Sequence, residues 1–202
     1  EYVEPCEAIR DGKLVIEDPL VGFEELTFPE PFGKLEAFNT SGGTSTLPQT
    51  YLGKVNELDY KTIRYPGHGH KMWCLLKLGL MDSKEIDVDG MKVNPRRVLE
   101  KCLENNLPPS GKDATLIRTT IEGWKGTESR ILEYEIVDLY DEATGLTSMM
   151  RTTSFPAAVT ALMMADGRIT KRGVLTPERC IPPDLFIEAL RSRGIDIKQT
   201  IN

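Results

Sequence analysis

The sequence is poor in histidine and lacks paired cysteines. Its only two histidines, His68 and His70, lie two positions apart. Structural zinc sites and redox motifs use closely spaced cysteines, usually as CxxC pairs, and no such pair occurs here. A chain of 202 residues is also large enough to fold without disulfides. We therefore expect reduced, mostly buried thiols at Cys6, Cys74, Cys102 and Cys180.

Long apolar runs and clusters of basic residues are also missing. No apolar stretch approaches the ~20 residues of a membrane-spanning helix, and the acidic first residues do not resemble a signal peptide. The formal charge is −6, the pI is near 5.1, and the densest basic pair is Arg96-Arg97. Binding to a phosphate backbone relies on clustered Lys and Arg. We therefore expect a cytoplasmic protein with neither a membrane nor a nucleic-acid partner.

The expected strands and helices follow one another irregularly. Hairpins are predicted to turn at Asp11-Gly12 and Asp89-Gly90. Asn94 is predicted to cap a helix that starts at Pro95. The apolar stripe of that helix is expected to consist of Val98, Leu99, Cys102 and Leu103. The remaining expected segments are strands at residues 34–39, 59–64, 114–124, 130–140 and 195–197, and helices that start near residues 47, 67, 152 and 182.

This irregular order indicates an α+β fold, with a mixed, mostly antiparallel sheet and helices packed on it. A doubly wound nucleotide-binding fold would need regular alternation of strands and helices and an early phosphate loop. The sequence has neither. Within residues 34–39 we expect Leu35 and Ala37 to point inward and Glu36 and Phe38 to point outward.

The densest group of useful side chains lies in residues 59–72, DYKTIRYPGHGHKM. The pattern predicts a strand that breaks at Pro66-Gly67 and continues into a helix. One bend would then project a guanidinium, a phenol and two imidazoles. The Gly67-His68-Gly69 triplet is similar to the start of a dinucleotide fingerprint, but Met72 stands where the third glycine should be. We therefore do not expect a nucleotide at this bend.

Arg64 closes the predicted strand beside the bend, where it could form a two-pronged bond to a carboxylate. The competing interpretation is a salt bridge to one of the 31 acidic residues of the chain. The hydroxyl- and glycine-rich loop 40–46 either binds a small polar ligand or is a flexible turn. Thr152-Thr153-Ser154 predicts a helix start whose free amides either attract an anion or are simply capped.

Several stretches, taken in order, resemble the C-terminal part of the saccharopine dehydrogenase family. They are residues 33–40 (GKLEAFNT), 44–48 (TSTLP), 61–68 (KTIRYPGH), 154–158 (SFPAA), 166–169 (DGRI) and 173–178 (GVLTPE). The resemblance covers nearly the whole chain and favours the lysine 6-dehydrogenase branch. Saccharopine reductases usually have an aromatic residue after the glycine of the bend, where this chain has His68.

The resemblance implies that residues 1–202 are one C-terminal substrate-binding and dimerisation domain. The family's N-terminal Rossmann domain, which binds NAD or NADP, is absent from this chain. The full-length parent would be an NAD(P)-dependent oxidoreductase acting at a C–N bond of lysine or of a lysine adduct such as saccharopine, with the chemistry supplied by the cofactor. We expect this chain alone to bind no cofactor, to be inactive, and to form a homodimer.

The resemblance also assigns roles to residues. Arg64 would pair with the carboxylate of the amino-acid substrate. Tyr65, His68, Thr40 and Thr153 would line the substrate site, while Thr152 and Ser154 would approach the cofactor. No catalytic residue and no metal ligand are assigned.

Two other interpretations stay open. In one, the domain stands alone as a non-catalytic binding or assembly module. In the other, His68 and His70 serve a metal-dependent hydrolase, although their spacing with Cys74 matches no familiar zinc pattern.

Overall fold

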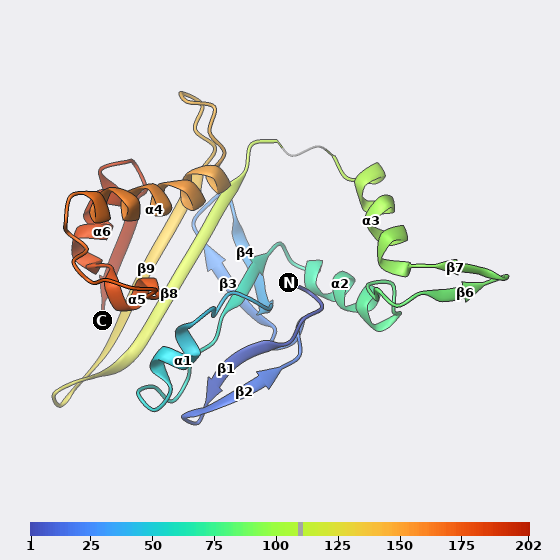
Figure 1. Cartoon of the computed structure of the whole chain (residues 1–202), viewed down its shortest axis with the longest axis horizontal. Coiled ribbons are helices and arrows are strands. Elements are labelled where there is room, and N and C mark those ends of the chain that lie inside the picture. The colour runs from blue at the N-terminus through green and yellow to red at the C-terminus, as the bar shows by residue number, and fades with distance from the viewer. Residues whose placement is uncertain (109–110) are drawn as a thin grey trace. The chain divides into compact units, whose positions relative to one another are not determined.

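The computed structural model describes residues 1–108 and 111–202. The chain forms two compact units, Glu1–Pro108 and Pro109–Asn202. Figure 1 shows the elements of both units, coloured along the chain. Each unit combines small antiparallel sheets with helices, which confirms the predicted α+β class.

Within the first unit, β1 pairs with β2, β4 lies between β3 and β5, and β6 pairs with β7, all antiparallel. The strands are β1 (Cys6–Arg10), β2 (Lys13–Glu17), β3 (Glu24–Phe28), β4 (Gly33–Asn39), β5 (Lys61–Arg64), β6 (Ile86–Val88) and β7 (Met91–Val93). The helices are α1 (Leu47–Tyr51), α2 (His68–Lys77) and α3 (Pro95–Asn106).

The middle strand β4 is buried on both faces. Residues 35–39 are all buried, so the prediction that Glu36 and Phe38 point outward is wrong. The reason is that α2 packs over the face that carries these two side chains. The rings of Tyr2 and Phe23 cover Phe38 on the same side. Both faces of this strand are thus buried over residues 35–39, because the Glu36 carboxylate has internal hydrogen-bond partners.

Both predicted hairpins are confirmed. The φ angles are +49° and +73° at Asp11-Gly12, between β1 and β2, and +53° and +85° at Asp89-Gly90, between β6 and β7. Two successive positive φ angles define the turn that matches the twist of a hairpin, and Asp-Gly adopts it readily. Main-chain bonds between Ile9 and Leu58 also attach β1 to the segment before β5.

Helix α3 begins where it was predicted. The Asn94 side chain accepts a hydrogen bond from the Arg97 amide at 3.1 Å, and Pro95 occupies the first helical position. The expected buried stripe is wrong, because Val98 and Cys102 are exposed. The apolar side chains of the preceding β6–β7 hairpin, Ile86, Val88 and Met91, are exposed too, so this hairpin does not cover the stripe.

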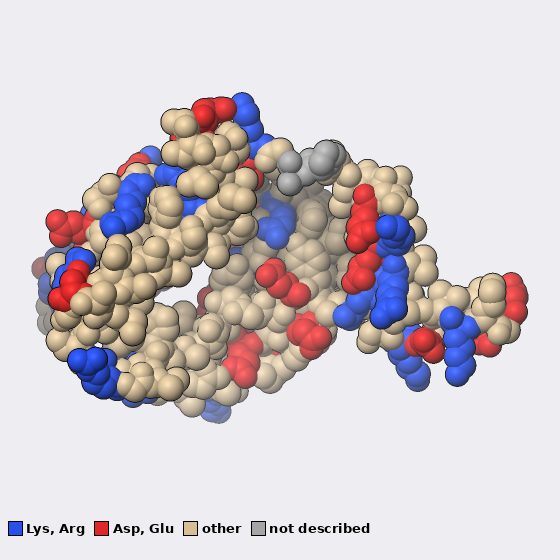
Figure 2. All heavy atoms as spheres, turned by 45° about the horizontal axis from the view of Figure 1, so that its top comes forward, with Lys and Arg blue, Asp and Glu red and all other residues tan. Residues whose placement is uncertain are grey.

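Charged side chains of both signs share α3 and the β6–β7 hairpin, on the right of Figure 2. The basic pair Arg96-Arg97 shares α3 with Glu100 and Glu104. Arg96 is also committed internally, because its Nε donates to the Met81 carbonyl at 2.7 Å. This helix therefore presents a surface of mixed charge.

The second unit is one antiparallel sheet in the order β10-β9-β8, with helices on it. A long hairpin over the predicted segments pairs Ala114 with Leu139 at one end and Lys125 with Glu128 at the other. The elements are β8 (Ala114–Lys125), β9 (Glu128–Leu139), α4 (Ser148–Ala165), α5 (Pro177–Cys180), α6 (Pro183–Arg191) and β10 (Ile197–Ile201).

The core of the second unit lies between its sheet and two helices. Helix α4 packs on α6 and on strands β8 and β9, an arrangement visible in Figure 1. The buried side chains of this core are Val159, Met163, Ile169, Leu190, Ile195 and Ile197.

The predicted start of α4 is wrong. The helix begins at Ser148, so Thr152 to Ser154 lie within it and Pro156 is an interior residue. The cap is Thr147, whose hydroxyl accepts from the Met150 amide at 3.0 Å. Proline near a run of polar residues is typical of the first turn of a helix. Here residues before Ser148 accept from the first helix amides, so the helix starts four residues before Thr152.

The cysteines are free, but they are not mostly buried. Only Cys6 is buried; Cys74 and Cys102 are exposed and Cys180 is intermediate. The prediction failed because α2 and α3 turn these thiols outward. Among the described helices, none is long and apolar enough to cross a membrane.

Candidate functional site

The bend between β5 and α2 positions the predicted site residues of the first unit. At Gly67, which caps α2, φ is +87°, a left-handed conformation that favours glycine. The His68 amide donates to the Tyr65 carbonyl at 3.2 Å, which closes the turn. Arg64 ends the strand and His68 starts the helix, so the two lie on either side of one tight bend.

The carboxylate of Glu36 caps the first turn of α2. Its oxygens accept from the Gly67 amide at 2.8 Å and from the Gly69 amide at 2.7 Å. Burial alone would raise the pKa of Glu36, but the Gly69 and Gly67 amides outweigh it and hold the pKa below its usual value. An internal anion therefore occupies the amides that a phosphate would need. The bend does not fit the pyrophosphate of a nicotinamide cofactor.

Aromatic rings hold the bend against β4. The buried Phe38 ring lies 6.4 Å from the His68 ring with 7° between their planes. Tyr2 packs edge-on against both, at 6.0 Å from Phe38 and 5.8 Å from His68. Gly69 allows this approach, because a Cβ there would lie 2.5 Å from Phe23 and 2.7 Å from Phe38. Packing therefore fixes the orientation of the His68 imidazole.

The Arg64 guanidinium is exposed and carries an uncompensated charge. Its Nε donates to the Tyr2 hydroxyl at 3.1 Å, and its Nη1 donates to the Ile63 carbonyl at 2.8 Å. No carboxylate among the described residues forms an ion pair with it. The alternative of an internal salt bridge is therefore not realised in that part of the chain. Among the described residues, none accepts from Nη2 or from the second Nη1 hydrogen, so these donors can meet a ligand.

His68 is joined to the same network. Its Nε2 lies 3.1 Å from the Tyr2 hydroxyl. Burial and the neighbouring Arg64 cation lower the pKa of His68 from its usual value, Glu36 acts in the opposite direction, and Lys71 adds a smaller decrease. These surroundings therefore favour the neutral imidazole. Among the described residues, no group of three or more His, Cys, Asp or Glu side chains could hold a metal ion.

The other predicted residues of this unit differ in accessibility. Tyr65, at the bend, is 64% exposed. Thr40 is 2% exposed, and its hydroxyl shares a 2.6 Å hydrogen bond with the Thr62 hydroxyl on the neighbouring strand. Arg64 and His68 are thus joined through Tyr2, Tyr65 is available at the surface, and the Thr40 hydroxyl is engaged inside the unit.

The loop after β4 is packed rather than loose. The Thr44 hydroxyl donates to the Glu7 carbonyl at 3.1 Å. A Cβ at Gly43 would lie 1.9 Å from the Tyr60 ring, so only glycine fits there. This hydroxyl supports the neighbouring strand and is not free for a ligand.

In the second unit, the hydroxyls of Thr152, Thr153 and Ser154 bond back along their own helix. Thr152 donates to the Ser148 carbonyl at 2.9 Å, and Ser154 donates to the Met150 carbonyl at 2.7 Å. Such back-bonding satisfies hydroxyls in a helix interior. The hydroxyl protons of these residues are therefore used within the helix, and their amides are not those of a helix start.

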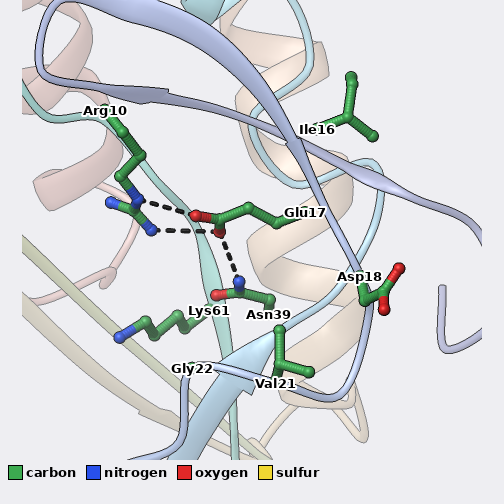
Figure 3. Close-up of a pocket in the computed structure, with 8 residues that line it drawn as sticks. All are labelled: Arg10, Ile16, Glu17, Asp18, Val21, Gly22, Asn39 and Lys61. Atoms are coloured by element: carbon green, nitrogen blue, oxygen red, sulfur yellow. Dashed lines mark hydrogen bonds and ion pairs between the residues drawn. The ribbon is translucent and has the colours of Figure 1, made fainter.

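Sequence reasoning missed a pocket of about 530 Å³ in the first unit, shown in Figure 3. Arg10 makes a two-pronged bond to Glu17, whose carboxylate also accepts from Asn39 at 2.6 Å. Arg10 also pairs with Glu57 and Asp59. Because three carboxylates surround this arginine, the network holds β1, β2 and β4 together and leaves Arg10 no charge for a ligand.

Residues 1–195 match the family described as "Saccharopine dehydrogenase C-terminal domain". The chain belongs to the saccharopine dehydrogenase C-terminal domain family. The match includes both the bend after β5 and helix α4, and it confirms the family resemblance of the motifs quoted above.

Two known proteins are similar to this chain. Carboxyaminopropylagmatine dehydrogenase of Synechocystis sp. is 27% identical over 132 residues, which are 62% of this chain and 32% of that protein. The apo saccharopine dehydrogenase (L-Glu forming) of Saccharomyces cerevisiae has the same fold, with a TM-score of 0.72 and 17% identity over 98% of this chain and 59% of that one. The chain therefore spans about a third to three fifths of these relatives.

Two site residues were missed by sequence reasoning. Tyr2 precedes the first strand and has no local signal that would link it to Arg64, 62 positions away. Glu36 was placed on the outer face of its strand, although it lies under α2. No signal within the strand marks this position, because Glu36 is buried only once α2 packs over β4.

Proposed function

We propose that this chain is the substrate-binding and dimerisation domain of an NAD(P)-dependent amino-acid oxidoreductase. The parent enzyme would act at a C–N bond of lysine or a lysine adduct. Membership of the family and the names of the two relatives, both dehydrogenases, support this class of reaction. Hydride transfer belongs to the cofactor, and the bend of this chain does not fit a dinucleotide.

The observation that carries the proposal is the free charge of Arg64. A guanidinium whose Nε and Nη1 are held by Tyr2 and Ile63 keeps a defined orientation. Its remaining donors can meet the carboxylate of an amino acid in the two-pronged geometry that arginine favours. Tyr65 and His68 lie at the same bend and would contact the rest of the ligand.

Titration calorimetry with lysine, saccharopine and glutamate tests this role. We expect wild-type protein to bind one of the three, and Arg64→Ala to weaken that binding at least about tenfold, because a charge-assisted pair is lost. Arg64→Lys keeps the positive charge but cannot make the two-pronged bond of a guanidinium, so it should recover only part of the affinity. Arg97→Ala, on α3, should bind like wild type. Equal affinity of Arg64→Ala and wild type would exclude Arg64 from the site.

We further propose that the isolated chain is inactive. With NAD or NADP and lysine, it should give no change in absorbance at the wavelength of reduced cofactor, because Glu36 already occupies the amides of the bend that a pyrophosphate would need. Turnover by the isolated chain would contradict this assignment.

A specific observation favours the dimerisation part of the proposal. Helix α4 has one charged residue in 18, Arg151, and that side chain pairs inward with Asp138 and Asp141. Its outer face exposes Met149, Met150, Leu162 and Met164 around small residues. A second copy of this face would bury apolar surface without like-charge repulsion. A stand-alone assembly module remains the alternative, favoured if the protein dimerises but binds none of the three ligands.

A further inference from the structure

The Tyr2 hydroxyl is hydrogen-bonded to two groups, the Arg64 guanidinium and the His68 imidazole. The Arg64 guanidinium has only donors, so the Tyr2 oxygen must accept from its Nε. The His68 Nε2 lies 3.1 Å from the same oxygen. It accepts when the imidazole is the neutral tautomer with its proton on Nδ1, and it donates when the imidazole is protonated. The direction of the Tyr2 O–H therefore depends on His68.

When neutral His68 carries its proton on Nδ1, the Tyr2 proton points to Nε2 and the hydroxyl offers no donor to a ligand. With protonated His68, the Tyr2 oxygen accepts from both Arg64 and His68. Its own proton must then turn to another acceptor. An acceptor bound at Arg64 would be near, because the Arg64 Nε lies only 3.1 Å from the Tyr2 oxygen.

We propose that Tyr2 is a third donor for a carboxylate held at Arg64, and that protonation of His68 makes this donor available. This inference rests on the proposed function, since it needs an anionic ligand at Arg64. Tyr2 is a binding and positioning residue in this scheme and has no assigned catalytic step. No covalent bond changes, because the imidazole takes its proton from solvent and the Tyr2 proton only reorients.

The charged groups around His68 determine the pH at which its imidazole becomes protonated. Arg64 from β5 and Lys71 from α2 oppose protonation, Glu36 from β4 favours it, and Tyr2 bonds the ring itself. A bound carboxylate would offset the charge of Arg64, which is the principal opposing cation. Binding and protonation should therefore reinforce each other, as linkage requires.

The ligand-free test uses the histidine tautomer. The chain has only two histidines, so nitrogen NMR chemical shifts assign each ring with one His70→Gln variant. At pH 7.5, neutral His68 should carry its proton on Nδ1. Tyr2→Phe keeps the ring contacts but removes the hydroxyl, and the preference should shift toward the Nε2–H form. A wild-type His68 protonated on Nε2 at pH 7.5 would overturn the inference whether or not a ligand binds.

The ligand test measures the affinity for L-lysine between pH 7.5 and 5.5, where its carboxylate stays ionised. Wild-type affinity should rise about tenfold as pH falls. Tyr2→Phe should rise only about threefold, from the imidazolium charge alone, and His68→Gln should not rise. His70→Gln, at the exposed neighbour, should keep the full wild-type response.

The outcomes separate the two proposals. If wild type binds but Tyr2→Phe shows the same pH response, the inference on Tyr2 is wrong and the carboxylate site stands. If no variant binds lysine at any pH while saccharopine or glutamate binds, the series is run with that ligand under the same criteria. If none of the three binds, the proposed function fails, and the ligand half of this inference fails with it.

Discussion

At the scale of single residues, two charged side chains near one bend differ in burial and in hydrogen bonding. Glu36 is buried, and backbone amides of α2 satisfy both of its oxygens. Arg64 is exposed, and its contacts leave its charge uncompensated. A buried charge must be fully hydrogen-bonded within the protein, whereas an exposed charge is solvated by water and is available to bind a ligand. The first is therefore expected to control stability and the second to control binding.

The first prediction concerns Glu36→Gln. One amide of α2 would lose its acceptor and face the NH₂ group of the new side chain, so unfolding free energy should fall by about 1–3 kcal/mol at pH 7. Urea unfolding measures this through Trp73, which lies on α2, in a Trp124→Phe background. Glu25→Gln is the matched control, because Glu25 is exposed and opposite Glu36 in the sheet. It should unfold like wild type.

The same substitution has a defined pH dependence. The pKa of Glu36 is lower in the folded chain than its usual 4.5. The stabilisation by its carboxylate is therefore complete above pH 4.5 and is lost as pH falls through the lowered folded value. The difference between wild type and Glu36→Gln should shrink below pH 4.5. A difference that grows on acidification would show that the carboxylate does not cap α2.

Residue-level expectations succeeded where the determinant was local. Asp11-Gly12 and Asn94-Pro95 specify a turn and a cap from their own backbone preferences, and both formed. Glu36 is buried because α2 packs over β4, and the residue spacing within the strand gives no indication of this packing. Tyr2 likewise reaches Arg64 only through the tertiary fold.

At the scale of elements, α4 shows how a distant side chain moves a helix boundary. The carboxylate of Asp113 accepts from the Ser148 amide at 2.7 Å and from the Met149 amide at 2.9 Å. Together with Thr147, it satisfies the first amides of the helix. Sequence placed the start at Thr152 because Thr and Ser are typical N-cap residues. An anchor 35 residues upstream of Ser148 could not be read from the local pattern.

The second prediction concerns Asp113→Ala. Two amides of α4 would lose their acceptor, so the second unit should be destabilised by about 1–2 kcal/mol. Hydrogen exchange should become faster in the first turn of α4, and Asp113→Asn should recover part of the protection. Asp196→Ala, an exposed carboxylate in the same unit, serves as control and should exchange like wild type. Unchanged exchange in Asp113→Ala would contradict the capping role.

At the scale of the whole molecule, the outer face of α4 has features that a monomer does not need. Ala157, Ala161 and Ala165 recur every four residues and share one side of the helix. Small side chains let two helix backbones approach closely, and the flexible methionines beside them can fill gaps. Exposed apolar surface of this kind on a helix without outward charge is typical of an association face.

The third prediction concerns Ala161→Arg, at the middle of this face. If two copies meet through α4, the arginine would be buried without a partner, and the dimer should weaken by about two orders of magnitude or more. Analytical ultracentrifugation should show a dimer for wild type and a monomer for the variant, with an unchanged far-UV spectrum. Ala143→Arg places the same charge on an exposed loop of that unit and should stay dimeric. A wild-type monomer, or a dimer that survives Ala161→Arg, would remove α4 as the interface.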